Sequence, residues 1–125
     1  MASVLVVEDE PGDRALLESW LHWMGHDVLS AASVGEATTL VARTGTDPAA
    51  VLDVAVLDIV MPDGSGLEVL QYLRQRPATA RIPAIFLSAS ELDTDRVAAR
   101  ALGAHFVAKP VTRSVLQAAV DAALM

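Results

Sequence analysis

The 125-residue sequence contains no cysteine, and this absence excludes a disulfide framework and any metal site built on thiolates. Basic residues are also few, because nine Lys and Arg stand against sixteen Asp and Glu and leave a net charge of -7. A nucleic-acid-binding surface needs a basic face. We therefore expect no direct contact with nucleic acid.

Long apolar stretches are absent as well, since no run approaches the roughly 18 residues that a membrane-spanning helix requires. The first residues, Met1–Ser3, lead straight into a short apolar run without the basic segment and longer apolar stretch of a signal peptide. We therefore expect no membrane association and a cytoplasmic location. The length suits one compact domain over residues 1–125, so any output function would lie in another protein or domain.

Two apolar patterns alternate along the chain. Short continuous runs typical of buried strands recur five times, and the segments between them carry apolar residues at helical spacing. Strands are expected at 4–7, 27–31, 54–57, 84–87 and 105–108. Helices are expected over 16–24, from a Ser33-x-x-Glu36 capping box toward Gly45, over 67–73, over 97–102 before Gly103, and over 115–124 after a Thr112 cap.

This alternation predicts an α/β fold. Continuous apolar strands are typical of parallel sheets covered by helices on both faces, and right-handed crossovers favour a doubly wound arrangement of the five strands. Ligands bind such sheets outside the carboxyl ends of the strands. Polar residues follow four of the strands at that edge, namely Glu8 and Asp9, Asp58, Ser88, and Lys109. We expect their side chains to converge on one site.

The acidic residues at this edge suit phosphoryl transfer. A carboxylate can act as a nucleophile toward a phosphoryl donor and form an aspartyl phosphate if a cation neutralises the charge of the transferred group. Mg2+ suits this task because it binds through one or two carboxylates plus substrate oxygens. Glu8, Asp9 and Asp58 would supply that environment. The alternative for Glu8 and Asp9 is a helix N-cap with solvated carboxylates.

The loop after Asp58 has a distinctive sequence, in which an acid-x-x-Met-Pro stretch ending at Pro62 precedes a glycine-rich turn and an apolar helix. Together with Lys109-Pro110, this stretch resembles the receiver domain of two-component response regulators, the family of the bacterial chemotaxis regulator. The resemblance extends over essentially the whole chain. It implies a doubly wound, flavodoxin-like five-stranded parallel sheet with strand order 2-1-3-4-5 and a crevice between the first and third strands.

The resemblance also implies a role for each acidic residue at this edge. Asp58 would be the phosphoacceptor, and Asp9 a direct Mg2+ ligand. Glu8 would bind Mg2+ through water, and the backbone carbonyl of Val60 would be a further ligand.

Residues of the last two strands would complete the implied site. Lys109 would contact Asp58 at rest and a phosphoryl oxygen afterwards, and its bond to Pro110 would be cis. Ser88 would donate its hydroxyl to the phosphoryl group, and Phe106 would be the switch aromatic. The signal would leave through the fourth helix, fifth strand and fifth helix, around Arg96, Arg100, His105, Arg113 and Gln117.

A domain of this kind is implied to be a phosphorylation-controlled switch rather than an enzyme acting on other substrates, because it catalyses only its own phosphorylation and dephosphorylation. Its phosphoryl group would come from a histidine kinase or a histidine phosphotransfer protein. The signalling face would contact an output protein or domain that the sequence does not identify, or a second copy in a homodimer. A stand-alone regulator and a receiver excised from a hybrid kinase or longer regulator both remain open.

Three other functions fit the sequence less well. A haloacid-dehalogenase-like phosphatase needs a second Asp two residues after the nucleophile as general acid, and Val60 occupies that place. A flavin-binding relative needs a phosphate loop after the first strand, where Glu8-Asp9-Glu10 would repel the phosphate. A non-phosphorylated pseudo-receiver would not need competent residues at all five functional positions.

Overall fold

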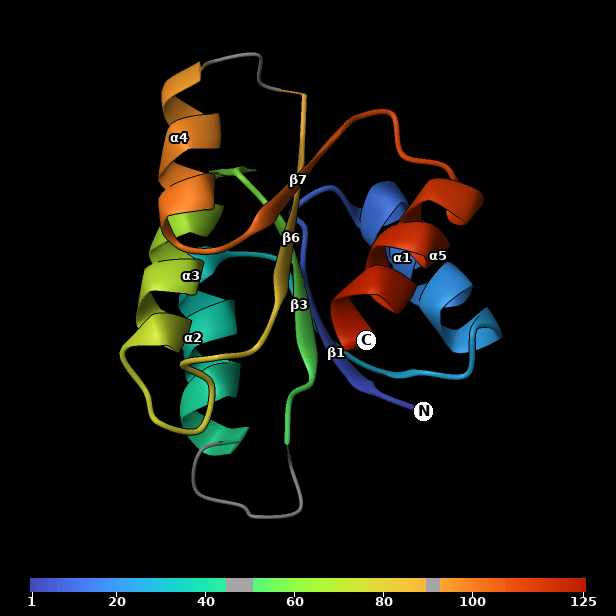
Figure 1. The fold of residues 1–125 in the computed structure, drawn as a ribbon, viewed down its shortest axis with the longest axis horizontal. Coiled ribbons are helices and arrows are strands. Elements are labelled where there is room, and N and C mark those ends of the chain that lie inside the picture. Colours follow the sequence, from blue (N-terminus) through green and yellow to red (C-terminus); the bar gives the residue numbers. More distant parts are fainter. Residues whose placement is uncertain (45–50, 90–92) are drawn as a thin grey trace.

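The computed structural model describes residues 1–44, 51–89 and 93–125. The Gly45-Thr46-Asp47-Pro48 stretch, which its turn-forming residues predict to be a loop, lies outside the described residues. A five-stranded parallel sheet with the order β2-β1-β3-β6-β7 forms the centre (Figure 1). Its strands are β1 Ser3–Val7, β2 Asp27–Ala31, β3 Val54–Asp58, β6 Ala84–Ser88 and β7 His105–Ala108. The helices are α1 Pro11–Trp23, α2 Val34–Thr44, α3 Gly66–Arg74, α4 Asp93–Ala101 and α5 Arg113–Leu124. Counted along the chain, the order of the sheet is 2-1-3-4-5, which confirms the predicted doubly wound fold.

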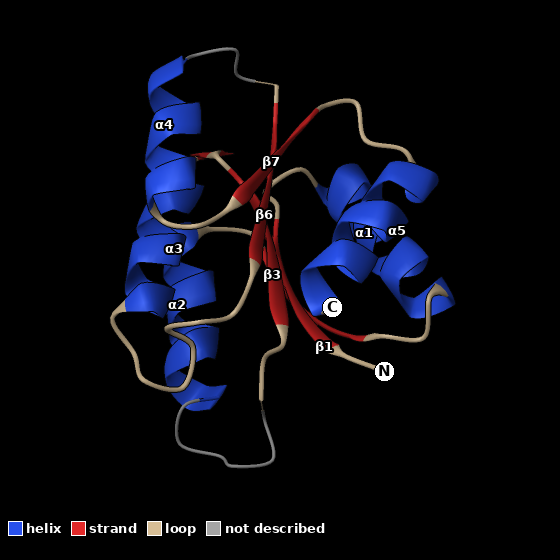
Figure 2. Cartoon of the chain, in the orientation of Figure 1, coloured by secondary structure: helices blue, strands red, loops and turns tan. Residues whose placement is uncertain are grey.

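The helices form one layer on each face of the sheet, with α2, α3 and α4 on one side and α1 and α5 on the other (Figure 2). Successive side chains of a strand point to opposite faces. In β1, Leu5 and Val7 pack toward α2 and α3, whereas Val4 and Val6 pack toward α1 and α5. This two-sided burial explains why the central strands are continuously apolar.

The apolar residues at helical spacing include some that the folded helices leave exposed. Leu16 of α1 is 47% exposed and Val97 of α4 is 67% exposed, although both match the apolar spacing. Among the described side chains of α4, Ala99 is buried, and in α1 Leu17 and Leu21 are buried. Within the described parts of the chain, no helix has the length and apolar character needed to cross a bilayer.

A short antiparallel hairpin, which the sequence pattern treated as a plain loop, connects β3 to α3. Its strands β4 Val60–Met61 and β5 Gly64–Ser65 pair Val60 with Ser65 and Met61 with Gly64. At its base the Gly66 N–H donates to the Ile59 carbonyl at 2.8 Å. The hairpin therefore folds back beside the end of β3 and places α3 directly behind Asp58.

This close approach predicts that residue 66 must be glycine. A Cβ atom on Gly66 would overlap the backbone carbonyl oxygen of Asp58, which cannot swing away as a flexible side chain would. We expect Gly66→Ala to lower the free energy of unfolding by about 1–3 kcal/mol, as overpacking does, in urea titrations followed by circular dichroism. The control is Gly35→Ala, whose Cβ would meet a side-chain oxygen of Asp63 at an ordinary 3.5 Å. Equal unfolding midpoints for the two variants would contradict this account.

Candidate functional site

The carboxyl ends of β1 and β3 bring three carboxylates together. The strands are parallel neighbours with Val7 opposite Leu57, so Glu8 and Asp58, each one residue further on, lie side by side. Side-chain oxygens of Glu8, Asp9 and Asp58 all lie within 4.8 Å of one another. This cluster occupies the crevice between the first and third strands, the kind of place at which doubly wound sheets bind ligands.

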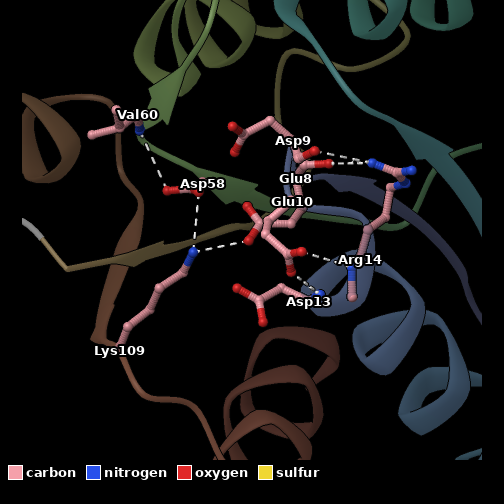
Figure 3. A network of polar contacts seen from close by, with 9 residues as sticks. Glu8, Asp9, Glu10, Asp13, Arg14, Asp58, Val60 and Lys109 are labelled. Atoms are coloured by element: carbon pink, nitrogen blue, oxygen red, sulfur yellow. Dashed lines mark hydrogen bonds and ion pairs between the residues drawn. The ribbon is translucent and has the colours of Figure 1, made fainter.

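Lys109, which follows β7, extends its side chain between two of these carboxylates (Figure 3). Its Nζ lies 2.9 Å from Oε1 of Glu8 and 3.0 Å from Oδ2 of Asp58. Its backbone N–H donates to the carbonyl of Ser88 at 2.9 Å, and its peptide bond to Pro110 is cis. One ammonium group is therefore shared by two carboxylates.

Glu8 has unusual surroundings for a carboxylate, because it is 1% exposed. Burial and, after it, the neighbouring Asp58 carboxylate raise its pKa to about 8 against the opposing effect of Lys109. Burial alone would lower the pKa of Lys109, but its hydrogen bonds to Glu8 and Asp58 and their charges outweigh that effect and raise it. Among the described residues, nothing hydrogen-bonds to the second, buried oxygen of Glu8, Oε2. The cluster thus has an excess of negative charge and a spare oxygen ligand.

Both carboxylate oxygens of Asp58 accept a hydrogen bond. Oδ2 accepts from Lys109, and Oδ1 accepts from the backbone N–H of Val60 at 3.3 Å. The residue is buried, whereas Asp9 beside it is exposed and Val60 is 65% exposed (Figure 3). Solvent therefore reaches the cluster from the side of Asp9 and the hairpin.

The helix-capping role that the sequence left open for Glu8 and Asp9 belongs to the next acid. Glu10 is the N-cap of α1, and its carboxylate accepts from the backbone N–H groups of Gly12 and Asp13. These two bonds lower the pKa of Glu10, that of Asp13 most. Sequence reasoning did not assign this role, although an acid directly before a proline at the first helical position is a recognisable start signal. Glu8 and Asp9 thus keep their carboxylates for the cluster.

The two expected switch residues lie on the last two strands of the sheet, β6 and β7. Ser88 is buried at the end of β6, and Phe106 is half-buried on β7, where it pairs with Phe86. The guanidinium of Arg96 lies over the Phe106 ring at 5.1 Å from its centroid, a contact that no local sequence pattern indicates. On the opposite side of the sheet, the guanidinium of Arg113 lies 4.3 Å from the ring centroid of Trp23 in α1. Arg113 is therefore engaged by α1 at the border of the predicted signalling face.

A groove of about 470 Å3 adjoins the cluster on the side of α1. Glu8 and Lys109 line its charged end, and Leu17, Trp20 and Val111 contribute apolar walls. The charged cluster thus opens next to an apolar surface that a second molecule can contact.

A parallel 2-1-3-4-5 sheet with acids after β1 and β3 and a lysine after β7 defines a class of phosphoryl-accepting signalling domain. Residues 4–121 match the response regulator receiver domain family, and the chain belongs to this family. It is a phosphorylation-controlled switch of two-component signalling. The matches support neither a haloacid-dehalogenase-like phosphatase nor a pseudo-receiver.

Relatives of two lengths resemble the chain. It is 31% identical to Protein PilH of Pseudomonas aeruginosa, covering 99% of this chain and 98% of that protein. It is 39% identical over 120 residues to the response regulator protein PilR of the same organism, covering 96% of this chain and 25% of PilR. The chain thus spans a quarter of one relative and nearly all of the other.

Solved structures have the same architecture. The chemotaxis protein CheY4 of Vibrio cholerae has a TM-score of 0.86 at 26% identity, with 99% of each chain covered. The receiver domain of the sensor histidine kinase PA1611 of Pseudomonas aeruginosa has a TM-score of 0.82 at 25% identity, covering 98% of this chain and 97% of that one. That structure has a magnesium ion coordinated in its active-site cleft.

The raised pKa of Glu8 predicts how pH acts on the metal-free domain. Between its ordinary value of 4.5 and about 8, the folded state binds more protons than the unfolded chain, so the free energy of unfolding should fall as pH rises through this window. Glu10 and Asp63 have lowered pKa values, and their stabilisation is lost only as pH falls below the ordinary carboxyl range.

Thermal unfolding in EDTA, from about pH 5 to about pH 8, tests this linkage. We expect the melting temperature of the wild type to decline across the window and that of Glu8→Gln to decline much less. Parallel declines in the two proteins would contradict the assignment of the slope to Glu8.

Proposed function

We propose that Asp58 is the phosphoacceptor of this domain. The observation that carries the proposal is the position of its carboxylate, which is 3.0 Å from the Lys109 ammonium and 3.3 Å from the Val60 amide, with oxygens of Glu8 and Asp9 in the same cluster. An oxygen of Asp58 attacks the phosphorus of a phosphohistidine. The O–P bond forms as the P–N bond breaks, and the leaving nitrogen keeps the electron pair.

The donor set of the site fits Mg2+. It offers hard carboxylate oxygens, Oε2 of buried Glu8 has no hydrogen-bond partner among the described residues and could accept from a metal-bound water, and Asp9 is open to solvent, as an ion that keeps several waters requires. In this proposal Asp9 and Asp58 bind Mg2+ directly, Glu8 binds through water, and the Val60 carbonyl is a further ligand. Bound Mg2+ would neutralise the charge of the phosphoryl oxygens during transfer.

Lys109 and Ser88 would respond to the phosphoryl group. Lys109 transfers its contact from Asp58 to a phosphoryl oxygen, and the Ser88 hydroxyl moves toward the same group. The Phe106 ring then turns inward behind β6. A tyrosine at this position could be held outside by a hydrogen bond of its phenolic hydroxyl, which Phe lacks. The inward state of Phe106 is therefore easier to populate than that of a tyrosine, even before phosphorylation. The altered face of α4, β7 and α5, around Arg96, Arg100, His105, Arg113 and Gln117, would contact an output partner or a second copy of the domain.

The donor would be a histidine kinase or a histidine phosphotransfer protein in the cytoplasm. Residues 1–125 would act as one receiver domain that catalyses only its own phosphorylation and dephosphorylation. The groove between α1 and Val111 supports this proposal, because it offers a protein donor an apolar contact next to Lys109 and Glu8.

Phosphorylation by a small donor tests the central assignment. We expect intact-mass measurement to show the addition of one phosphate when the protein is incubated with Mg2+ and acetyl phosphate, and no addition in Asp58→Asn, which keeps the size of the side chain but lacks the nucleophilic carboxylate. Asp53→Asn is a matched control just before the start of the same strand, where Oδ2 of Asp53 accepts from the Ser3 N–H at 2.7 Å. Phosphate addition to Asp58→Asn would contradict the assignment of Asp58 as the phosphoacceptor.

The metal site gives a separate prediction. Mg2+ bound only by the folded state should raise the melting temperature by mass action, and Asp9→Ala should lose this response while becoming more stable without metal, since one negative charge leaves the cluster. Differential scanning calorimetry at several Mg2+ concentrations measures both effects. Glu10→Ala is the control, because that acid caps α1 and should reduce stability without changing the Mg2+ response. Equal Mg2+ stabilisation of wild type and Asp9→Ala would show that Asp9 is not a ligand.

A further inference from the structure

The β4–β5 hairpin is joined at its tip to a helix far away in sequence. In the turn of the hairpin, the Asp63 carboxylate accepts from two backbone N–H groups at the start of α2, those of Val34 at 2.9 Å and Gly35 at 3.0 Å. The hydrogen bond from Gly35 and then that from Val34 hold the pKa of Asp63 below its ordinary value, so the carboxylate is charged at neutral pH. These bonds connect residues 28 and 29 positions apart.

The hairpin needs such a connection because its own structure is small. It has two residue pairs, and an isolated two-stranded ribbon is at best marginally stable in water. Met61 is buried at its centre, and Gly66 closes its base through the bond to Ile59. The Val60 side chain is 65% exposed and adds little packing. Among the described residues, Asp63 supplies the polar link that holds the tip.

The position of the hairpin matters for the charged cluster. The Val60 N–H donates to Oδ1 of Asp58, and its carbonyl belongs to the same short strand. A hairpin free to tilt about its base would displace both the amide and the carbonyl of Val60. The orientation of the Asp58 carboxylate and of the proposed backbone ligand therefore depends on how firmly the tip is held.

We propose that Asp63 is a positioning residue for the metal and phosphoryl site. It holds the hairpin against the N-terminus of α2 and so fixes the Val60 backbone beside Asp58. This inference rests on the proposed phosphoacceptor role of Asp58. It assigns to Asp63 an effect on Mg2+ affinity and phosphorylation that an ordinary helix cap would not have.

The start of α2 provides a matched control for that distinction. The Ser33 hydroxyl accepts from the Glu36 N–H at 3.1 Å and caps the same helix from its own side, and among the described residues it has no hydrogen bond to the hairpin. Ser33→Ala should weaken α2 as an ordinary cap loss does. Asp63→Ala should weaken α2 and also release the hairpin tip. The two variants thus separate helix stability from site geometry.

The experiment measures Mg2+ binding by isothermal titration calorimetry and the rate of phosphorylation by acetyl phosphate, at a temperature where circular dichroism shows every variant folded. We expect Asp63→Ala to weaken Mg2+ binding on the order of 10-fold, at the lower end of the range for outer-shell groups. Its phosphorylation rate should fall even at saturating Mg2+, because Asp58 loses its fixed orientation. Ser33→Ala should match the wild type in both measurements despite a lower melting temperature.

Asp63→Asn provides a further variant, because it removes the charge but keeps one acceptor oxygen, and we expect it to lie between wild type and Asp63→Ala. An Asn variant more impaired than the Ala variant would contradict this order and overturn the inference. Equal Mg2+ affinities for wild type and Asp63→Ala would also overturn it while leaving Asp58 as the acceptor. A wild type that takes up no phosphate from any donor would instead refute the proposed function.

Discussion

The shared ion pair of Lys109 with Glu8 and Asp58 is the interaction on which the rest of the site depends. The lysine lies 101 positions from one carboxylate and 51 from the other, and it follows β7, which is separated from β3 by β6. Its four-carbon side chain can span this width only if all the strands end at one edge. One ammonium cannot neutralise three clustered acids, and because a buried negative charge is costly, Glu8 keeps its proton at neutral pH, as its raised pKa indicates. A cation bound at the cluster would therefore stabilise the metal-free fold.

Three consecutive acids after β1 perform three different tasks because the chain changes direction there. Glu8 still lies within the sheet, where its backbone N–H donates to Ala31 of β2 and its side chain is buried. Asp9 is the first residue to leave the sheet, and its carboxylate is exposed at the open side of the cluster. Glu10 has the extended conformation of an N-cap and turns back onto α1. The direction of the chain at each of these positions therefore decides which acid serves the cluster and which serves the helix.

The sequence allowed prediction of the sheet and of the acidic cluster because both follow from local patterns. Continuous apolar runs mark the central strands, and parallel strands necessarily bring Glu8 and Asp58 to the same edge. The β4–β5 hairpin escaped prediction because two-residue strands are too short to show a period. The bond of Asp63 to α2 escaped because a cap supplied from 28 positions away leaves no local signal. The contact of Arg96 with the Phe106 ring also leaves no local signal in the sequence, because it depends on how α4 packs beside β7.

The Phe106 ring shows how the proposed switch balances two contacts of different strength. Outside, it is half-buried under the Arg96 guanidinium, and a cation–π contact at an exposed site is worth about 0.5–1 kcal/mol. Complete burial of a phenylalanine side chain is worth about 1.5–3 kcal/mol relative to exposure, so part of that gain remains available to a ring that turns inward. Because Ser88 and Phe106 lie on paired strands, space opened by Ser88 is open to the ring. Arg96 therefore opposes the inward state without a hydrogen bond, and loss of its contact with the ring would expose a guanidinium on the signalling face.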